Sequence, residues 1–352
     1  MPVTLKDIAE QSGVSISTVT RVLNGKAEKY RISKETSKVV LRTAKKLKYR
    51  PNQLARSLRL KRTQTVGLLA PDIANPFFAY VIRSIQNIAS HKGYSLIICD
   101  TNEDQQVEIE QTDLLWSKGV DGLIIMPVGL SFRHLKRMVK EKLPVILIDR
   151  CFDNLPFSSV VVDNYKGAFE AVEHLIEYGH RRIAIIQGLQ HTYTNNGRVR
   201  GYTDALKKYH IPIDDKLIVG SSFGRENGYE STKKLLALKN PPSAIFLTSD
   251  LIALGALEAL SEANRKIPDD ISLVTFDDMD FAPFLISPLT AVAQPKDLLG
   301  ETAIRMLIEQ IDSDGVHRKA RKEVLDTKLI VRESVKRCTN GKRKKRLAKR
   351  VV

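Results

Sequence analysis

The sequence predicts an N-terminal all-α head followed by an α/β core of two doubly wound lobes. Three observations lead to this fold class. Two capped helix starts flank a glycine near the N-terminus. After residue 64, short apolar runs rich in β-branched residues alternate with amphipathic stretches, which is typical of βαβ units around a parallel sheet. This alternation starts again near residue 182, and the restart indicates a second lobe.

The head is predicted to contain three short helices. The first begins after Thr4, and Asp7 completes a capping box with it. Gly13 supplies a turn, Ser15 caps a second helix, and Ser33 starts a third. Apolar residues mark the inward positions: Leu5, Ile8, Ala9, Val14, Val19, Val22, Leu23, Val40, Ala44 and Leu47. Two helices around a glycine turn outline a helix-turn-helix, a motif that reads DNA in the major groove.

The outward side of the second helix carries the side chains that would meet DNA. They are Ile16, Ser17, Thr20, Arg21 and Asn24. Short hydroxyls allow close approach to the groove, Arg21 can read guanine with two N–H groups, and Ile16 can meet a thymine methyl. A three-helix domain without DNA would show the same apolar periodicity, so this outward face and the charge carry the prediction.

A short segment after the head predicts a second contact with DNA. Residues 49–60 read as a proline stop, an Asn52 cap and a helix of about two turns, which is marginal in water by itself. A minor groove would bury its leucines and neutralise its arginines, so the segment would fold on DNA. The alternative is an ordinary linker helix between domains.

The core is predicted from two series of apolar strands separated by helices. Strands are expected at 66–70, 95–99, 122–126 and 145–149, then at 182–186, 217–220, 244–248 and 272–276. Helices are expected near 78–92, 105–118, 165–179, 198–209, 227–238 and 251–264. Two such lobes suit a ligand held between them at the carboxyl ends of the strands. The strand runs end in Asp72, Asp100, Asp149, Asp163, Asp250 and Asp277.

Positive charge is concentrated at the two ends of the chain. The net charge is +12 over residues 1–63 and +9 over residues 336–352, whereas the middle carries −5. A polyanionic partner is therefore expected for the ends and not for the body. The tail lacks the leucine heptads of an oligomerising helix, so we expect it to be disordered and to attract DNA weakly and nonspecifically.

Several classes of protein are disfavoured. The sequence has no apolar run of about 18 residues and no secretory start, so we expect a cytoplasmic, nucleoid-associated protein without membrane contact. Cys99, Cys151 and Cys338 are widely spaced and are interpreted as reduced structural thiols, with no metal or cofactor implied. A periplasmic sugar-binding protein would need an export signal. A sugar- or nucleotide-processing enzyme would have only Asp250 and Asp277 as visible acid/base candidates, so we expect no catalytic residues and no enzyme.

With these residues in view, the chain resembles the LacI/GalR family of bacterial transcriptional regulators from Thr4 to about Ser334. Beyond the head, the stretches that carry the resemblance are PNQLARSL at 51–58, VGLL at 66–69, NPFF at 75–78, GVDGLI at 119–124, GHRRI at 179–183, GRVRGY at 197–202, FDD at 276–278 and QP at 294–295. The loop at 25–31 is a few residues longer than in familiar members, so contacts from that loop are not carried over.

The resemblance implies a homodimeric repressor on a near-palindromic operator, with Leu58 wedged into the minor groove and a periplasmic-binding-protein-like core. It implies five segments: a DNA-binding domain (1–50), a hinge (51–63), a first lobe (64–163 plus about 293–323), a second lobe (164–292 plus about 324–335) and a tail (336–352). The implied DNA contacts are Thr4, Ser15, Ile16, Ser17, Thr18, Arg21, Asn24, Asn52, Leu54, Ala55, Ser57, Leu58 and Arg59.

The resemblance also implies that a small-molecule effector binds between the lobes and controls operator affinity. The implied effector contacts are Asn75, Phe77, Phe78, Arg150, Thr194, Arg198, Phe223, Asp250 and Asp277. A guanidinium and a carboxylate can each bind two neighbouring sugar hydroxyls, so a sugar or sugar derivative is favoured. A purine or nucleoside is the alternative, weakened because Thr192 stands where the purine repressor has an arginine.

Overall fold

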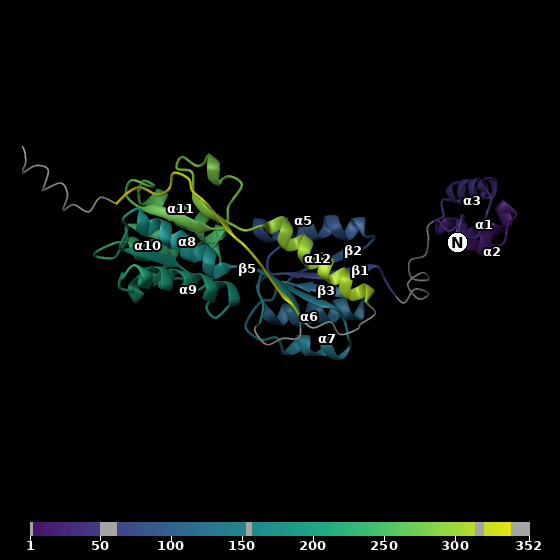
Figure 1. Cartoon of the computed structure of the whole chain (residues 1–352), viewed down its shortest axis with the longest axis horizontal. Coiled ribbons are helices and arrows are strands. Elements are labelled where there is room, and N and C mark those ends of the chain that lie inside the picture. Colours follow the sequence, from purple (N-terminus) through teal and green to yellow (C-terminus); the bar gives the residue numbers. More distant parts are fainter. Residues whose placement is uncertain (1–2, 50–61, 153–156, 314–319, 339–352) are drawn as a thin grey trace, which may run out of the picture. The chain divides into compact units, whose positions relative to one another are not determined.

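The computed structural model describes residues 3–49, 62–152, 157–313 and 320–338. The chain separates into two compact units, Met1–Thr63 and Gln64–Val352, which are described in turn (Figure 1). Among the described residues, no helix is long and apolar enough to cross a membrane. The predicted helix within 51–60 lies outside the described residues.

The head consists of three helices around a small apolar core. They are α1 (Leu5–Ser12), α2 (Ile16–Leu23) and α3 (Lys34–Lys46). The capping box of Thr4 and Asp7 is present, Gly13 adopts a left-handed conformation, and Ser15 and Ser33 cap the next two helices. The core contains the apolar residues expected from the sequence, with Ile8, Val19 and Val40 fully buried. The predicted helix-turn-helix is confirmed.

The first lobe of the core contains a six-stranded parallel sheet in the order β11-β5-β4-β3-β1-β2. Its strands are β1 (Thr65–Ala70), β2 (Ser95–Asp100), β3 (Gly122–Ile125), β4 (Val145–Ile148), β5 (Ser158–Val162) and β11 (Lys322–Leu325). The four strands predicted from their apolar runs, β1 to β4, are all present. Strand β2 differs in burial because it lies at the sheet edge, where Ile97 and Ile98 are exposed.

Helices cover both faces of this sheet (Figure 1). On one face lie α5 (Pro76–His91) and α12 (Lys296–Asp312), which contact each other and share one apolar cluster with the strands. On the other face lie α6 (Gln105–Ser117), the short turn η1 (Arg133–Leu135) and α7 (Lys136–Lys140). Helix α12 comes from the far end of the sequence, so the two ends of the core chain complete one lobe.

The second lobe repeats the plan with the strand order β12-β10-β9-β8-β6-β7. Its strands are β6 (Ile183–Ile186), β7 (Ile218–Val219), β8 (Ala244–Leu247), β9 (Ser272–Phe276), β10 (Thr290–Ala293) and β12 (Lys328–Ile330). All pairings are parallel except that of β10 with β12. One face is covered by α8 (Asn164–Glu177) and α9 (Tyr193–Lys208), and the other by α10 (Arg225–Leu236) and α11 (Asp250–Glu262). Short turns η2 (Asp215–Leu217) and η3 (Ala282–Phe284) complete it.

The chain passes between the lobes three times, between β5 and α8, between β10 and α12, and between β11 and β12. The predicted return to the second lobe at about 324 is slightly early, because β11 pairs with β5 through Leu325. The tail predicted at 336 also begins too early. Residues 336–338 are bound to the second lobe: the Lys336 amide donates to Ser272, and the Cys338 amide donates to Tyr178. Residues 339–352 lie outside the described chain.

Candidate functional site

A cavity of about 370 Å³ lies between the two lobes of the core. The strands of both sheets end beside it, because the carboxyl ends of β4 and β9 lead directly into Asp149 and Asp277. All nine residues that the sequence assigns to the effector line this cavity: Asn75, Phe77, Phe78, Arg150, Thr194, Arg198, Phe223, Asp250 and Asp277. The predicted topology therefore brings together side chains that lie as far apart in the sequence as Asn75 and Asp277.

The helices differ from the sequence prediction in ways that position these side chains. Helix α5 begins at Pro76, two residues before the predicted start, so Phe77 and Phe78 both lie in its first turn, and the Asn75 side chain caps that helix by accepting from the Phe77 amide at 2.8 Å. Helix α9 begins at Tyr193, five residues before the predicted start. Thr194 and Arg198 therefore lie one helical turn apart and face the cavity together.

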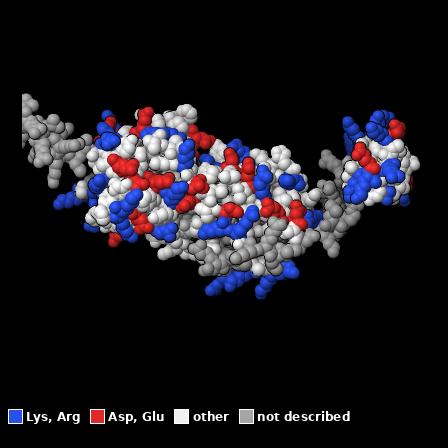
Figure 2. Space-filling model, in the orientation of Figure 1, with Lys and Arg blue, Asp and Glu red and all other residues white. Residues whose placement is uncertain are grey.

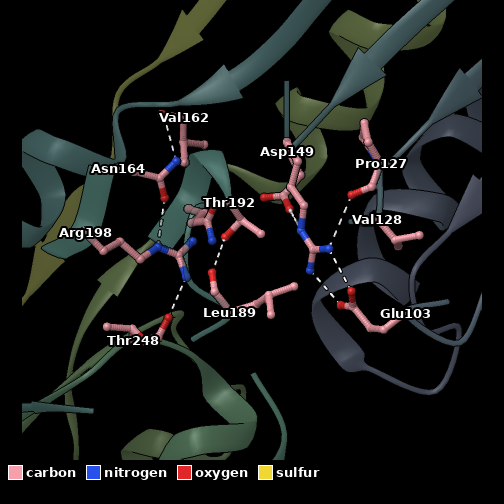
Figure 3. A network of polar contacts seen from close by, with 12 residues as sticks. Glu103, Pro127, Val128, Asp149, Val162, Asn164, Leu189, Thr192, Arg198 and Thr248 are labelled. Carbon is pink, nitrogen blue, oxygen red and sulfur yellow. Dashed lines mark hydrogen bonds and ion pairs between the residues drawn. The ribbon is translucent and has the colours of Figure 1, made fainter. Parts of the chain in front are cut away.

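Arg198 is held rigidly in the second lobe (Figure 3). It is 3% exposed, its Nε donates to Asn164 at 2.8 Å, and a terminal N–H donates to the Thr248 carbonyl at 2.5 Å. Its guanidinium carbon lies 3.8 Å from the centroid of the Phe276 ring. Burial lowers the pKa of Arg198, although Asp277 and Asp149 oppose this shift. The group is therefore a fixed cation at the cavity wall.

Arg150 is engaged more fully than the sequence suggests. Its two terminal nitrogens donate to the two carboxylate oxygens of Glu103 at 2.8 and 2.6 Å, and one also donates to the Pro127 carbonyl at 3.3 Å. Burial disfavours the charge on Arg150, but the carboxylates of Glu103, Asp149 and Glu108 together outweigh burial and raise its pKa. The outer edge of the guanidinium is thus occupied, and its buried Nε, which has no hydrogen-bond acceptor, lies 3.8 Å from a carboxylate oxygen of Asp149.

Three buried carboxyl groups face these cations. Burial raises the pKa of Asp149 to about 6, even though Arg150 and Arg198 lower it. Burial also raises the pKa values of Asp250 and Asp277, and the nearby Asp277 charge adds to the effect on Asp250. Asp149 and Asp277 have positive φ angles of 65° and 78°. A non-glycine residue in this region is uncommon, so the backbone is strained where the two strands meet the cavity.

Aromatic and unpaired polar groups complete the cavity. The Phe223 ring centroid lies 5.4 Å from the Arg150 guanidinium carbon, and the rings of Phe77 and Phe78 are 5.2 Å apart in an edge-to-face arrangement. Within the described chain, the Thr194 hydroxyl and the Gln294 side-chain carbonyl are buried without a hydrogen-bond partner. A buried polar atom without a partner is costly, so these atoms favour a polar ligand.

Several residues of the cavity were not assigned to the effector from the sequence, and Glu103 and Gln294 are two whose side chains hydrogen-bond to assigned residues. Glu103 follows β2 and pairs with Arg150, and Gln294 follows β10 and donates to Asp277. Both obey the rule that ligand-side residues follow parallel strands, which could have found them. The same rule gave two residues that lie elsewhere: Asp100 accepts from the Asn102 amide, and Asp163 caps α8. Neither lines this cavity.

The outward face of α2 is the second candidate site. Ile16 is 48% exposed, and Ser17, Arg21 and Asn24 are exposed beside it. Some polar groups are already used: Thr4 is bound in the capping box, and the Asn24 amide donates to the Thr20 carbonyl at 2.7 Å. Three of the predicted contacts are hydroxyl side chains that cluster at the start of the helix. The Ser15 hydroxyl lies within hydrogen-bond distance of the hydroxyls of Ser17 and Thr18.

The charge distribution agrees with two different surfaces. On the head, lysine and arginine predominate in the visible face, whereas the core shows both signs interspersed (Figure 2). The predicted hinge contacts Asn52, Leu54, Ala55, Ser57, Leu58 and Arg59 lie outside the described residues. In the residues that are described, no group of three or more His, Cys, Asp or Glu side chains could hold a metal ion.

The head and the core both match one protein family. Residues 4–52 match the profile of bacterial regulatory proteins of the lacI family, and residues 63–338 match the profile of periplasmic binding proteins and the sugar binding domain of the LacI family. The chain belongs to the LacI family. Like the relatives it matches, it is a DNA-binding transcriptional regulator and not an enzyme.

Two curated relatives illustrate the similarity. The HTH-type transcriptional regulator DegA of Bacillus subtilis is 36% identical over 338 residues, covering 95% of this chain and 98% of the relative. The HTH-type transcriptional repressor PurR of Pectobacterium carotovorum is 36% identical over 314 residues, covering 88% and 91%.

Two solved structures of regulators show the same architecture. The lac repressor dimer bound to operator and the anti-inducer ONPF has a TM-score of 0.84 at 26% identity, covering 96% of this chain and all of the other. The transcriptional regulator CelR in complex with cellobiose has a TM-score of 0.71 at 30% identity, covering 94% and 99%.

Proposed function

We propose that this LacI-family regulator is a repressor that binds a near-palindromic operator as a homodimer. A sugar that occupies the cavity between its lobes then lowers or raises its affinity for the operator. One observation carries the proposal. Nine side chains assigned to an effector from the sequence come from both lobes and line a single cavity of about 370 Å³. A cavity of this size suits one small ligand.

The chemistry of the lining favours a neutral sugar. The cavity wall contains five carboxyl groups, from Asp72, Glu103, Asp149, Asp250 and Asp277, but only two guanidinium groups. Both guanidinium groups already have protein acceptors. The surplus groups are acceptors, so a ligand rich in hydroxyl donors would bind, and a phosphate or a carboxylate would be repelled. The cellobiose bound to the CelR relative supports the same class.

A purine or nucleoside is the second candidate, because PurR repressors are among the relatives with the most similar sequences. The aromatic groups Phe77, Phe78 and Phe223 would suit a base as well as a pyranose. Thr192 is less favourable for a base, because its hydroxyl is already used to donate to the Leu189 carbonyl at 2.7 Å (Figure 3).

We propose a separate role for each segment of the chain that the sequence analysis predicts. Residues 1–50 read the operator through Ile16, Ser17 and Arg21, and residues 51–63 form the hinge between the head and the core. The two lobes close on the effector. Their relative angle changes the spacing of the two hinges in a dimer, so operator affinity shifts by the difference in the effector's affinity for the two states. The protein would act in the cytoplasm, at the nucleoid.

A thermal-shift screen of the full chain against neutral sugars, sugar phosphates, nucleosides and purines tests this function. A ligand at about 100 times its Kd stabilises the folded state by about 2.7 kcal/mol, which is readily detected. We expect a neutral sugar to raise the Tm of the wild type. Arg198→Lys should lose this response, because lysine cannot offer paired N–H donors.

Arg200→Ala is the matched control, since Arg200 lies on the same helix, is exposed and does not line the cavity. It should retain the sugar response of the wild type. A response to purines alone would replace the sugar with the second candidate. A response that Arg198→Lys retains in full would contradict the assigned cavity.

A further inference from the structure

The longer loop between α2 and α3 is folded tightly onto the head. The Lys26 amide donates to the Arg21 carbonyl at 2.8 Å, and the Ile32 amide donates to the Ala27 carbonyl at 2.9 Å. Ala27 and Ile32 also pack against the apolar core of the head. The loop is therefore fixed at both ends, and the residues between Ala27 and Ile32 have a defined position.

This loop places an aromatic ring on the arginine of the recognition helix. The guanidinium carbon of Arg21 lies 4.1 Å from the centroid of the Tyr30 ring. The Tyr30 amide lies 3.3 Å from the carbonyls of Lys26 and Ala27, which holds the residue in the turn. Tyr30 is 44% exposed, so its ring serves mainly this contact and not the core of the head.

The stacked arrangement leaves the arginine able to read a base. The ring covers one face of the guanidinium, whereas the N–H donors point outward in the plane of the group. In the described part of the head, these donors have no hydrogen-bond or ion-pair acceptor. A bidentate contact with guanine uses two such in-plane donors. The contact with Tyr30 therefore restricts the rotation of Arg21 without occupying the atoms that a base would need.

We propose that Tyr30 is a positioning residue for DNA reading: it orients Arg21 before the operator is bound and makes the 25–31 loop part of the specificity apparatus. The inference rests on the proposed role of Arg21 as a base-reading residue. A free arginine loses rotamer freedom when it binds a base, and a stacked arginine has already lost much of it. The benefit is confined to the base pairs that Arg21 reads.

The test uses the full chain and a duplex selected by the wild type from a library with about 20 randomised base pairs. Each base pair of the selected duplex is then replaced in turn, and the Kd of each replacement is compared with that of the selected duplex. Four single variants are measured: Arg21→Ala, Tyr30→Leu, Tyr30→Phe and Lys29→Ala. Tyr30→Leu keeps an apolar side chain but removes the ring, Tyr30→Phe keeps the ring, and Lys29→Ala is an exposed control in the same loop.

We expect Arg21→Ala to remove discrimination at one base pair of each half-site. Tyr30→Leu should lower discrimination at those same base pairs by about two- to five-fold, the range of an exposed cation–π contact. Tyr30→Phe should match the wild type, and Lys29→Ala should change no single position. In the double variant Arg21→Ala/Tyr30→Leu, no further loss should appear at those positions, because Tyr30 acts through Arg21.

Three outcomes would overturn the inference in distinguishable ways. If Tyr30→Leu lowers affinity equally for every duplex, or only lowers the Tm, its role is structural. If Arg21→Ala removes discrimination and Tyr30→Leu leaves it intact, the stacking has no role in reading. If Arg21→Ala changes discrimination at no position, the proposed base contact itself fails, and the positioning role fails with it.

Discussion

At the scale of single residues, the cavity concentrates buried charge that the fold does not fully neutralise. The buried residues Asp149, Asp250 and Asp277 line the same cavity as Arg150 and Arg198. Each of these carboxyl groups holds a proton more tightly than an exposed aspartate does, as their raised pKa values indicate. Such groups are typical of functional sites, where stability is lost in order to hold a ligand.

The raised pKa of Asp149 can be tested by measuring how the stability of the protein depends on pH. Its pKa is about 6 in the folded protein and 3.8 ordinarily, so the folded state holds the proton more tightly. The stabilisation from this group is therefore present below about pH 4 and is lost as the pH rises through 6. Asp149→Asn keeps the neutral form at every pH. The variant should be more stable than the wild type by about 1 kcal/mol at pH 4.5 and by about 3 kcal/mol above pH 7.

Urea unfolding followed by the fluorescence of Trp116, the only tryptophan, measures this difference in free energy. Asp100→Asn is the control, because Asp100 also lies at the carboxyl end of a strand but is exposed. A stability difference between Asp149→Asn and the wild type that stays constant from pH 4.5 to 8 would contradict the raised pKa.

At the scale of elements, close helix packing holds the second lobe together. Helices α10 and α11 approach most closely at Gly255, where an added Cβ would lie 1.9 Å from the Arg225 carbonyl oxygen and 2.6 Å from the Tyr229 amide nitrogen. Both neighbours are backbone atoms, so relief requires one helix to move. Asp250 begins α11, and a shift of this helix would reach the cavity.

Gly255→Ala should therefore destabilise the core. In an isolated helix this change would be favourable by about 1 kcal/mol, but overpacking of a tight contact costs about 1–3 kcal/mol and outweighs it here. Gly224→Ala is the matched control, because the nearest atom to its added Cβ is 3.9 Å away. Thermal unfolding of both variants decides the point, and equal Tm values for the two would refute the packing argument.

The hinge provides a second prediction at this scale. If Leu58 enters the minor groove, Leu58→Ala should weaken binding to a selected operator duplex far more than binding to random DNA, because only the specific complex is bent around a wedge. Kd values for both duplexes at a fixed salt concentration measure the effect. Equal losses on both duplexes would show that Leu58 acts on general affinity alone.

The elements also show what sequence patterns can and cannot predict. Strands β1 to β4 and β6 to β9 were predictable from their continuous apolar runs, although the edge strands β2 and β7 are not fully buried. The buried strands β5 and β10 were not predicted. The short strands β11 and β12 carry lysines and are half-buried, so they lack this pattern. Helix α12 lies outside the predicted helices, and its place in the first lobe could not be read from the chain order, because the preceding strand of that lobe, β5, ends more than 130 residues earlier.

The sequence predicted residues that line the cavity but not which side chains contact each other. Strand ends and the family resemblance placed nine side chains at the cavity. The pairing of Arg150 with Glu103 joins residues 47 positions apart and depends on how the loops after β2 and β4 meet. No local pattern encodes such a contact. The stacking of Tyr30 on Arg21 was hidden for the same reason, since it depends on the folded path of a loop.

At the scale of the whole molecule, the proposed function requires two sites that influence each other: a DNA-binding face on the head and a ligand cavity in the core. The head presents Ile16, Ser17 and Arg21 on one exposed face, and the core encloses a cavity with surplus carboxyl groups. A coupling between two sites is a free energy, and it must act in both directions. A sugar that changes operator affinity by a given factor must have its own affinity changed by the operator by that factor.

The central claim is this coupling, and one pair of titrations tests it directly. The Kd of the full chain for a selected operator duplex is measured without sugar and with saturating amounts of the sugar that gives the largest thermal shift. The sugar Kd is then measured with and without the duplex. We expect both ratios to differ from one by the same factor, between about 5 and 150. Operator affinity that is identical with and without saturating sugar would contradict the account.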